Sequence, residues 1–498
     1  MLAAACLAVA VGLTPLFYLG VRTAEAGADR IAAELFTVRT AELAGRSVLL
    51  AVVVTVLCLV IGVALAYLVV RTDLPGRQLF GVVAALPLAI PTYVAGFAWL
   101  AAVDRFEGFW ATALVLTLCS YPYVYLPVTA ALAGADPAQD EVSRALGRGA
   151  WRTFTGVTLR QLRPSMASGG LLVALYVFSD FGAVSLLRYD TFTRAIFTKF
   201  NLGFDRTGAL VLSTVLVALT AVVLLGESLA RSRARYARVG GTRRPPSRLA
   251  LGRLRWPFVA APALVAGLAL GVPAVSLTGW LLSGVSRPEP IGAVLTAAGN
   301  SLWVSLLGAL VTVLLALPIG LLAARHSGAL PVLLERASYA GHALPGLVTG
   351  LSLVFFAIAV AYPLYQTTAM LALGYGVLFL PLAVAAVRAA AAQSPPGLEE
   401  VARSLGRGPW YVLRTVTLPL TAPGIGAGAA LVFLTCVKEL PATLLLRPTG
   451  VDTLATELWT KTSVAAYAGA APYAALLVLL SAVPTWLLAR RTGVWSAS

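Results

Sequence analysis

Two stretches of this sequence are close copies of one another: EVSRALGRGAWRTFTGVTLRQLRP at 141–164 and EEVARSLGRGPWYVLRTVTLPLTAP at 399–423. In each, charged residues at helical spacing precede a glycine, Gly147 or Gly406, which permits a sharp turn. A second helical stretch then leads into an apolar run. Because loops are usually the variable parts of a fold, a loop preserved twice in one chain indicates a function that is carried twice.

The duplication extends outward from these stretches over most of the chain. Matching residues follow in the same order on both sides, and their spacing shifts only at loops, where insertions are tolerated. The sequence therefore predicts two homologous halves. The matched pairs are Ser47/Ser301, Arg71/Arg325, Pro91/Pro345, Tyr121/Tyr375, Pro127/Pro381, Glu141/Glu400, Arg144/Arg403, Gly147/Gly406, Trp151/Trp410, Leu159/Leu418, Pro164/Pro423, Arg188/Arg447, Asp190/Asp452 and Lys199/Lys461.

The composition is that of a membrane protein. Of 498 residues, 59% are apolar and 12% charged, and the mean hydropathy is +0.87, whereas a soluble domain carries about 25% charged residues. Apolar runs of about 20 residues, long enough to cross the hydrocarbon core as a helix, recur along the chain. We expect an all-α polytopic membrane protein with about twelve spans, at 2–21, 46–70, 79–103, 109–133, 165–187, 207–230, 256–283, 300–324, 331–360, 365–390, 422–446 and 468–489.

The distribution of charge predicts the domains and their orientation. Six spans in each half mean that both halves insert the same way up. Nine arginines lie in 231–255, and the positive-inside bias places this segment and both chain ends in the cytoplasm. We expect a first repeat at 1–230 with an inner loop at 136–164, a linker at 231–255, and a second repeat at 256–498 with an inner loop at 392–423. Ala24-Glu25-Ala26 resembles a signal-peptidase site, but the preceding run lacks the basic segment that cleavage requires.

Several functional classes are disfavoured. A phosphate-binding loop needs Gly-Lys followed by Ser or Thr, and none of Lys199, Lys438 and Lys461 follows a glycine. We therefore expect no enzyme and no cofactor in this chain. The net charge of +16 lies in loops between apolar runs, which favours a lipid bilayer over nucleic acid as the partner. The four cysteines lie in apolar runs without pair spacing, so neither a disulfide framework nor a metal-binding box is expected.

The duplicated loops are candidate docking elements. Glu141, Arg144 and Arg148 fall on one helical face, as do Glu400, Arg403 and Arg407. An exposed charged helix with an apolar flank (Val142, Ala145 and Leu146) is suited to docking into a partner's groove. The alternative is an interfacial helix that lies on lipid. Two copies in register favour docking on a two-fold partner.

The pattern of a glutamate, five further residues and a glycine, followed by a Leu-Pro or Pro stop, resembles the EAA loop of ABC importer permeases. The resemblance covers nearly the whole chain and implies the type I importer fold, a bacterial inner membrane location, and contact with two cytoplasmic ATPase subunits that bind ATP and magnesium. It also implies an external substrate-binding protein. The first copy departs from the pattern, with Leu159-Arg160 where the second has Leu418-Pro419. The coupling residues that the resemblance implies are Glu141, Arg144, Ala145, Gly147, Arg148, Glu400, Arg403, Ser404, Gly406 and Arg407.

Two carboxylates mark a candidate pathway. Asp180 and Glu439 occupy equivalent positions inside expected spans, and a charge there costs about 2.5–3.5 kcal/mol on insertion scales, so it usually faces a cavity or a partner. A hard cation prefers such oxygen ligands, which makes both residues weak metal candidates. The alternative, which we favour slightly over direct metal ligation, is a structural gate in which Lys438, Arg188 or Arg447 holds a carboxylate. The full set of candidate pathway and gate residues is Ser179, Asp180, Lys438, Glu439, Pro441, Arg188 and Arg447.

The substrate is suggested by resemblance. The segment CVKELPATLLLRPTGVDTLATELW, at 436–459, resembles fused permeases of ferric-ion importers. Related fused permeases carry thiamine, polyamines or phosphonates, which remain alternatives. A twelve-helix ion-coupled secondary transporter is an alternative from a different class, but it gives no reason for a doubled inner loop.

Overall fold

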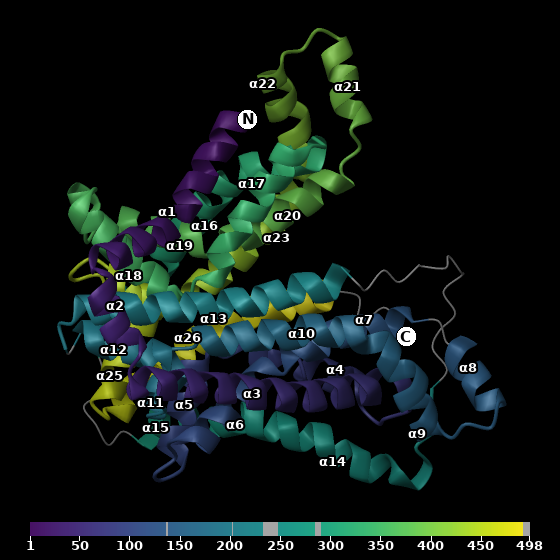
Figure 1. Cartoon of the computed structure of the whole chain (residues 1–498). Helices are drawn as coiled ribbons and strands as arrows, with labels where there is room; N and C mark the ends of the chain where they lie inside the picture. The colour runs from purple at the N-terminus through teal and green to yellow at the C-terminus, as the bar shows by residue number, and fades with distance from the viewer. Residues whose placement is uncertain (136–137, 202, 233–247, 284–289, 492–498) are drawn as a thin grey trace. The chain divides into compact units, whose positions relative to one another are not determined.

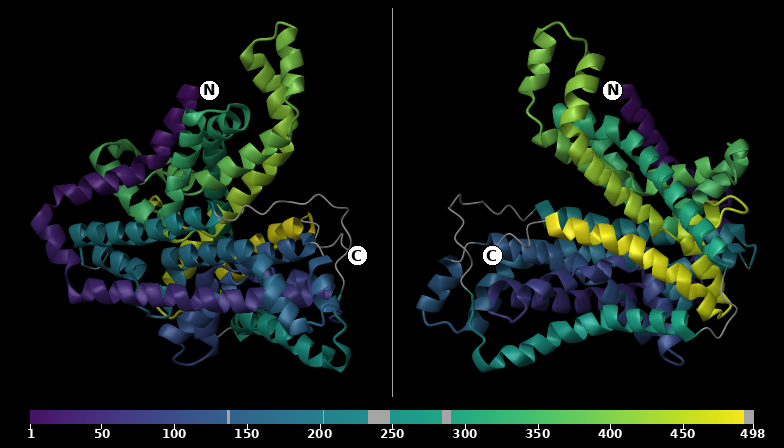
Figure 2. Two further views of the ribbon diagram at one scale, coloured as in Figure 1. Left: turned by 45° about the vertical axis from the view of Figure 1, so that its right-hand side comes forward. Right: turned by 180° about the vertical axis from the view of Figure 1, so that it is seen from behind.

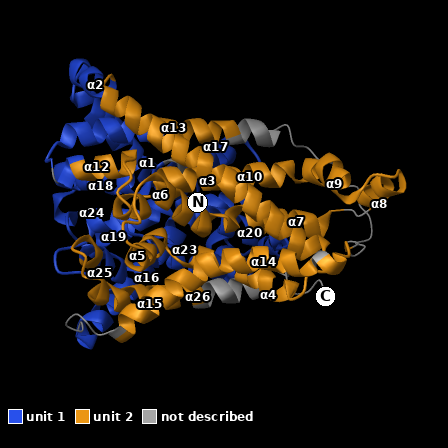
Figure 3. Ribbon diagram, turned by 90° about the horizontal axis from the view of Figure 1, so that it is seen from below, with its two compact units in different colours: residues 1–35, 199–217, 289–460 blue, residues 36–198, 218–288, 461–498 orange. Residues whose placement is uncertain are grey.

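The computed structural model describes residues 1–135, 138–201, 203–232, 248–283 and 290–491 (Figure 1). Over these ranges the regular structure is helical, apart from one bridge between Thr72 and Leu249. Most of the expected linker, 233–247, lies outside the described residues. The chain forms two compact units, coloured separately in Figure 3: unit 1 comprises 1–35, 199–217 and 289–460, and unit 2 comprises 36–198, 218–288 and 461–498.

Unit 2 is built on the first repeat. Its centre is the long helix α3, which packs against α6, α7 and α10, while α11 packs on α5. The helices that lie wholly in this unit are α3 Val38–Arg71, α4 Arg77–Val83, α5 Thr92–Ala102, α6 Phe109–Ser120, α7 Pro122–Gly134, α8 Ala138–Ala145, α9 Ala150–Thr153, α10 Leu159–Ser179, α11 Gly182–Leu186, α14 Arg255–Ala266, α15 Val272–Ser283 and α26 Tyr467–Arg491.

Unit 1 repeats this arrangement with the second half of the chain. Helix α16 packs against α19, α20 and α23, and α24 packs on α18. Its helices are α1 Leu2–Glu25, α2 Ala28–Leu35, α16 Ile291–Arg325, α17 Ala329–Tyr339, α18 Gly346–Ala359, α19 Thr368–Leu378, α20 Leu380–Gln393, α21 Gly397–Ser404, α22 Pro409–Val412, α23 Leu418–Val437 and α24 Pro441–Leu446. Helices α12 Phe192–Asn201, α13 Arg206–Ser232 and α25 Leu454–Ser463 continue from one unit into the other.

The two repeats exchange their first helices. Helix α1 packs on α16, α17 and α18 of the second repeat, and its Ala5 and Val9 belong to the hydrophobic core of unit 1. Helices α14 and α15, joined by a π-helical turn at Gly267–Gly271 into the long teal rod of Figure 2, pack on the first repeat through α5. The compact units are thus a different division of the chain from the sequence repeats, and the predicted domain boundaries stay a prediction.

Small residues let the central helices approach closely. A Cβ at Gly169 of α10 would lie 2.8 Å from the carbonyl oxygen of Tyr123 in α7, and a Cβ at the equivalent Gly428 of α23 would overlap Ala386 of α20. Packing through small residues is characteristic of helices in lipid, where no hydrophobic force drives helices together. The same device therefore closes both repeats.

Seven helical segments among the described residues are long and apolar enough to cross a membrane, and two bent pairs add candidates. The spans expected at 79–103, 165–187, 331–360 and 422–446 are each interrupted. Pro91 and Pro345 stand at the starts of α5 and α18, and the other two breaks fall at Asp180–Phe181 and at Lys438–Leu440. The seven segments are Leu2–Glu25, Val38–Arg71, Phe109–Gly134, Arg206–Gly226, Arg255–Leu282, Ile291–Arg325 and Pro409–Val437.

Candidate functional site

Each duplicated loop folds as a helical hairpin that ends its first helix in the same way. In α8–α9, Gly147 has φ 78°, its amide donates to the Arg144 carbonyl at 2.9 Å, and the Arg148 amide donates to Ser143 at 3.2 Å. In α21–α22, Gly406 has φ 76° and makes the corresponding bond to Arg403 at 3.0 Å. This is the Schellman arrangement, in which a left-handed residue satisfies the last carbonyls of a helix. The expected sharp turn thus rests on glycine at both positions.

Both hairpins expose the same apolar side chains on their surfaces. Leu146 is 73% exposed and the equivalent Leu405 is 74% exposed. Val142 and Trp151 are exposed beside Leu146, and Val401 and Trp410 are exposed beside Leu405. Of the charged candidates, Arg144 is half-buried, whereas Glu141, Arg148, Glu400, Arg403 and Arg407 are exposed, as are Ala145 and Ser404. Each hairpin therefore carries an apolar patch rimmed by charge.

The opposite side of each hairpin is anchored by an ion pair that sequence reasoning missed. In the second repeat, Arg325 at the end of α16 donates from Nε to Glu399 Oε1 at 3.0 Å and from Nη1 to the Ser394 carbonyl at 3.1 Å. Glu399 is buried and also pairs with Arg403 at 3.3 Å. A carboxylate and a guanidinium so arranged fix the hairpin to the C-terminal end of α16.

The first repeat has the equivalent pair in a looser geometry. Arg71 Nη1 at the end of α3 lies 3.5 Å from Asp140 Oδ2, and both residues are buried. The three side-chain nitrogens of Arg71 are buried without a hydrogen-bond partner in the described part of the chain. The Thr158 hydroxyl donates to Asp140 Oδ1 at 3.1 Å. The available signal was the Arg71/Arg325 match, together with an acidic residue just before each of Glu141 and Glu400.

Asp180, between α10 and α11, caps a short helix. Its Oδ1 accepts bonds from the amides of Ala183 and Val184 at 3.1 and 3.2 Å, and Thr92 of α5 donates to its Oδ2 at 2.5 Å. A carboxylate at this position satisfies the free amides of a helix start and faces the positive end of its dipole. Ser179, the last residue of α10, is half-buried beside it.

Glu439 does the same in the second repeat. Its Oε1 accepts from the Ala442 amide at 3.1 Å, and its Oε2 accepts from the Thr443 amide and hydroxyl, each at 3.0 Å. The longer side chain has Gly346 opposite it, where the first repeat has Thr92; a Cβ at Gly346 would lie 2.5 Å from Glu439 Oε1. Pro441 begins the capped helix α24, and Lys438 is a half-buried residue at the end of α23.

The arginines expected near these carboxylates pair elsewhere. Arg188 lies 3.3 Å from Glu107, within unit 2, and Arg447 pairs with Asp452, within unit 1. Among the residues that the structure describes, no three His, Cys, Asp or Glu side chains form a metal-binding group. Asp180 and Glu439 belong to different units, and each is described only within its own.

A further charged cluster lies in the loop after α11. Asp190 accepts hydrogen bonds from Arg39 at 2.7 Å and Arg194 at 2.6 Å, with Arg46 at 3.8 Å. Burial raises the pKa of Asp190, but the Arg39 hydrogen bond and the charges of Arg194, Arg39 and Arg46 outweigh it and leave the pKa below its ordinary value. In the second repeat the equivalent Asp452 pairs with Arg447, and its carbonyl accepts from Asn300 at 2.9 Å.

The chain matches a known protein family and several characterised transport proteins. The family model described as "Binding-protein-dependent transport system inner membrane component" matches residues 58–235 and again 316–491. The chain is 41% identical over 481 residues to the "Fe(3+)-transport system permease protein FbpB 2" of Haemophilus influenzae, covering 95% of this chain and 94% of that protein. It is 31% identical over 202 residues to the Escherichia coli "Molybdenum transport system permease protein ModB", 36% of this chain and 88% of that protein. It is 28% identical over 195 residues to the E. coli "Sulfate transport system permease protein CysT", which covers 35% of this chain and 70% of that protein.

Proposed function

Since the chain belongs to the family of binding-protein-dependent transport system inner membrane components, and is the permease of an ABC importer, we propose that it carries ferric ion into the cytoplasm. The observation that carries the proposal is the extent of the match to a Fe(3+)-transport permease, which includes both repeats. The molybdenum and sulfate permeases match only about a third of this chain. The family assignment sets aside the ion-coupled secondary transporter considered from the sequence.

Uptake into vesicles tests the substrate. The permease is reconstituted with its ATPase and binding protein, and ATP-dependent uptake of radiolabelled ferric ion is compared with thiamine, a polyamine, a phosphonate, molybdate and sulfate. We expect ferric ion uptake to exceed the others by at least about tenfold, the ratio that corresponds to 1.4 kcal/mol of discrimination. Equal or greater uptake of another solute would overturn the ferric assignment and leave the family assignment intact.

Two ATPase subunits are proposed to dock on the two hairpins, α8–α9 and α21–α22, in the cytoplasm. The exposed pairs Leu146/Leu405 and Trp151/Trp410 supply apolar anchors, and Glu141/Glu400 and Arg148/Arg407 supply a charged rim. The ATPase subunits bind ATP and magnesium. Both ends of the permease chain lie on the cytoplasmic side of the membrane, as the ATPase subunits do. The binding protein delivers substrate from the other side of the membrane.

Substitution of the apolar anchors tests this docking. Burial of a leucine side chain contributes about 1.5–3 kcal/mol, so Leu146→Asp/Leu405→Asp is expected to abolish co-purification of the ATPase with the full-length permease. The matched control Leu146→Met/Leu405→Met keeps an apolar side chain and is expected to retain it. Retention of the ATPase by the aspartate variant would exclude these leucines as anchors.

We propose that α11 and α24 are gate segments, and that Asp180 and Glu439 hold them in place. Direct ligation of the ion is disfavoured because the carboxylate oxygens already cap these two helices. Asparagine caps a helix about as well as aspartate, so Asp180→Asn should keep ferric uptake within about threefold of the original chain. Asp180→Ala removes the cap and should lower the free energy of unfolding by about 1 kcal/mol. A direct ligand would instead give loss of ferric uptake in both variants, Asp180→Asn included. In this proposal the hairpins transmit the closure of the ATPases to the membrane spans. The pathway between the repeats then opens alternately to the two sides of the membrane.

A further inference from the structure

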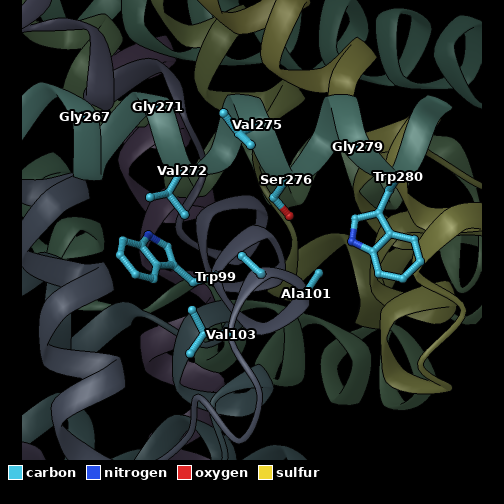
Figure 4. A pocket seen from close by; sticks show the side chains of 11 residues that line it. Trp99, Ala101, Val103, Gly267, Gly271, Val272, Val275, Ser276, Gly279 and Trp280 are labelled. Atoms are coloured by element: carbon cyan, nitrogen blue, oxygen red, sulfur yellow. The ribbon is translucent and has the colours of Figure 1, made fainter. Parts of the chain in front are cut away.

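An apolar groove of about 660 Å³ runs along the π-helical turn Gly267–Gly271 and α15 in unit 2 (Figure 4). Its floor follows one face of the helix through Gly267, Gly271 and Gly279, and residues of α5 form the wall opposite. Trp99 and Trp280 stand near its two ends in Figure 4. A Cβ added at any of the three glycines would meet nothing within 4 Å, so their missing side chains leave the space open.

One buried hydroxyl lies in this apolar groove. Ser276 is only 8% exposed, it lines the groove, and its hydroxyl has no hydrogen-bond partner among the described residues. Other hydroxyls on the long helices, such as Ser213 and Ser301, donate to the carbonyl four residues earlier. A buried hydroxyl without a partner costs about 1–3 kcal/mol, so a ligand with an acceptor is favoured beside Ser276.

The depth of Ser276 indicates which acceptor is available. The segment Arg255–Leu282 has 28 residues and rises about 42 Å, the thickness of a bilayer with its headgroup regions. Ser276 lies about 10 Å from the end of α15 on the same rise, near the boundary between headgroups and hydrocarbon. The ester carbonyls of glycerophospholipids lie at this boundary, and tryptophan is enriched there.

We propose that a phospholipid of the surrounding bilayer occupies this groove, with one acyl chain along the glycine face and an ester carbonyl accepting a hydrogen bond from Ser276. A transmembrane helix is the competing occupant, because rows of small residues also receive helices. However, a helix uses its carbonyls in its own backbone bonds and so offers few acceptors for Ser276. The lipid fits both the apolar floor and the buried hydroxyl of Ser276.

Lipid retention by the full-length chain tests the proposal. The permease is purified in detergent, and dioleoylphosphatidylglycerol is titrated while native mass spectrometry counts bound lipid. Gly271→Leu fills the groove and should weaken the specific binding step at least about tenfold, and Ser276→Ala should weaken it about threefold to tenfold, the effect of one ordinary hydrogen bond. Gly20→Leu, at an exposed and equally open glycine of α1, is the matched control and should bind as the original chain does.

A second readout separates the lipid from a helix. Val275 is 74% exposed at the groove, and benzoylphenylalanine in its place should form a photo-adduct with the mass of a phospholipid. If Gly271→Leu does not fold, Gly279→Leu replaces it. Equal lipid binding in all variants, or a photo-adduct formed only with a polypeptide, would overturn the proposal; neither result depends on ferric uptake, so the proposed function is tested separately.

Discussion

The duplicated hairpins of the two repeats, α8–α9 and α21–α22, share their sequence and backbone but not their anchors. In the second repeat, Arg325 makes hydrogen bonds to Glu399 and to the Ser394 carbonyl. In the first, Arg71 is more deeply buried, yet its nearest approach to Asp140 is 3.5 Å. Glutamate is one methylene longer than aspartate, and that length lets its carboxylate reach the arginine. Duplication has therefore preserved the position of the pair without preserving its geometry.

The first anchor has a further neighbour, the end of the linker. The Leu249 amide donates to the Arg71 carbonyl at 2.8 Å, and the Asp73 amide donates to the Leu249 carbonyl at 3.2 Å. Asp73 also accepts from the Leu251 amide at 2.8 Å through its side chain. The end of the linker is thus fastened beside Arg71.

Removal of one carboxylate should show the largest difference between the anchors. Breaking a well-made buried pair typically costs about 3–5 kcal/mol, so we expect Glu399→Gln to lower the free energy of unfolding by that amount. Asp140→Asn should cost only about 1–2 kcal/mol, because Arg71 forms no hydrogen bond that would be lost. Unfolding in sodium dodecyl sulfate measures both. Equal losses would mean that the pair in the first repeat is as strong as its partner in the second.

Replacement of both partners by apolar residues sharpens the comparison. A buried ion pair with poor geometry is often less stabilising than apolar residues of similar volume, by about 1–4 kcal/mol. Arg71→Met/Asp140→Leu is therefore expected to leave stability unchanged or raised. Arg325→Met/Glu399→Leu is expected to lower stability, by about 1–2 kcal/mol, because it removes formed hydrogen bonds. The same unfolding titration checks the ranking, and a reversed ranking would refute it.

Lengthening one side chain should convert the first anchor into the second. Asp140→Glu brings the carboxylate closer to Arg71, and a new charge-assisted hydrogen bond should raise the free energy of unfolding by about 1 kcal/mol. The matched change Glu399→Asp should lower it by a similar amount. A destabilised Asp140→Glu variant would indicate that space beside Arg71, rather than side-chain length, limits the pair.

Much of this architecture could be predicted from the sequence, because it depends on local patterns. Apolar runs predicted membrane helices, and Gly147 and Gly406 marked the two turns. The anchors could not be predicted in this way. Arg71 ends an apolar run, where an arginine is usually interfacial, and its carboxylate lies in a different loop. Only packing brings Arg71 and Asp140 together.

Two other features were missed for different reasons. Which repeat α1 packs on could not be predicted, because apolar surfaces attract without direction. The capping role of Asp180 and Glu439 did have a signal, since Pro441 after Glu439 is typical of a helix start. A charge inside an expected span instead favoured a pathway role, and the roles of these residues stay a prediction.

The smallest expected effect lies at the other end of the repeats. Three arginines lower the pKa of Asp190, so its ionised form stabilises the fold. This contribution is fully present above the ordinary aspartate pKa, near 3.9, and is lost as pH falls through the lower value in the folded protein. We expect Asp190→Asn to reduce stability by less than about 1 kcal/mol at pH 7, because these side chains are partly exposed. The difference from the original chain should vanish once the pH falls below the lowered pKa of Asp190 in the folded protein, and unfolding titrations at pH 7 and across the acid range measure it. A difference that persists at low pH would assign the effect of Asp190 to hydrogen bonding rather than to its charge.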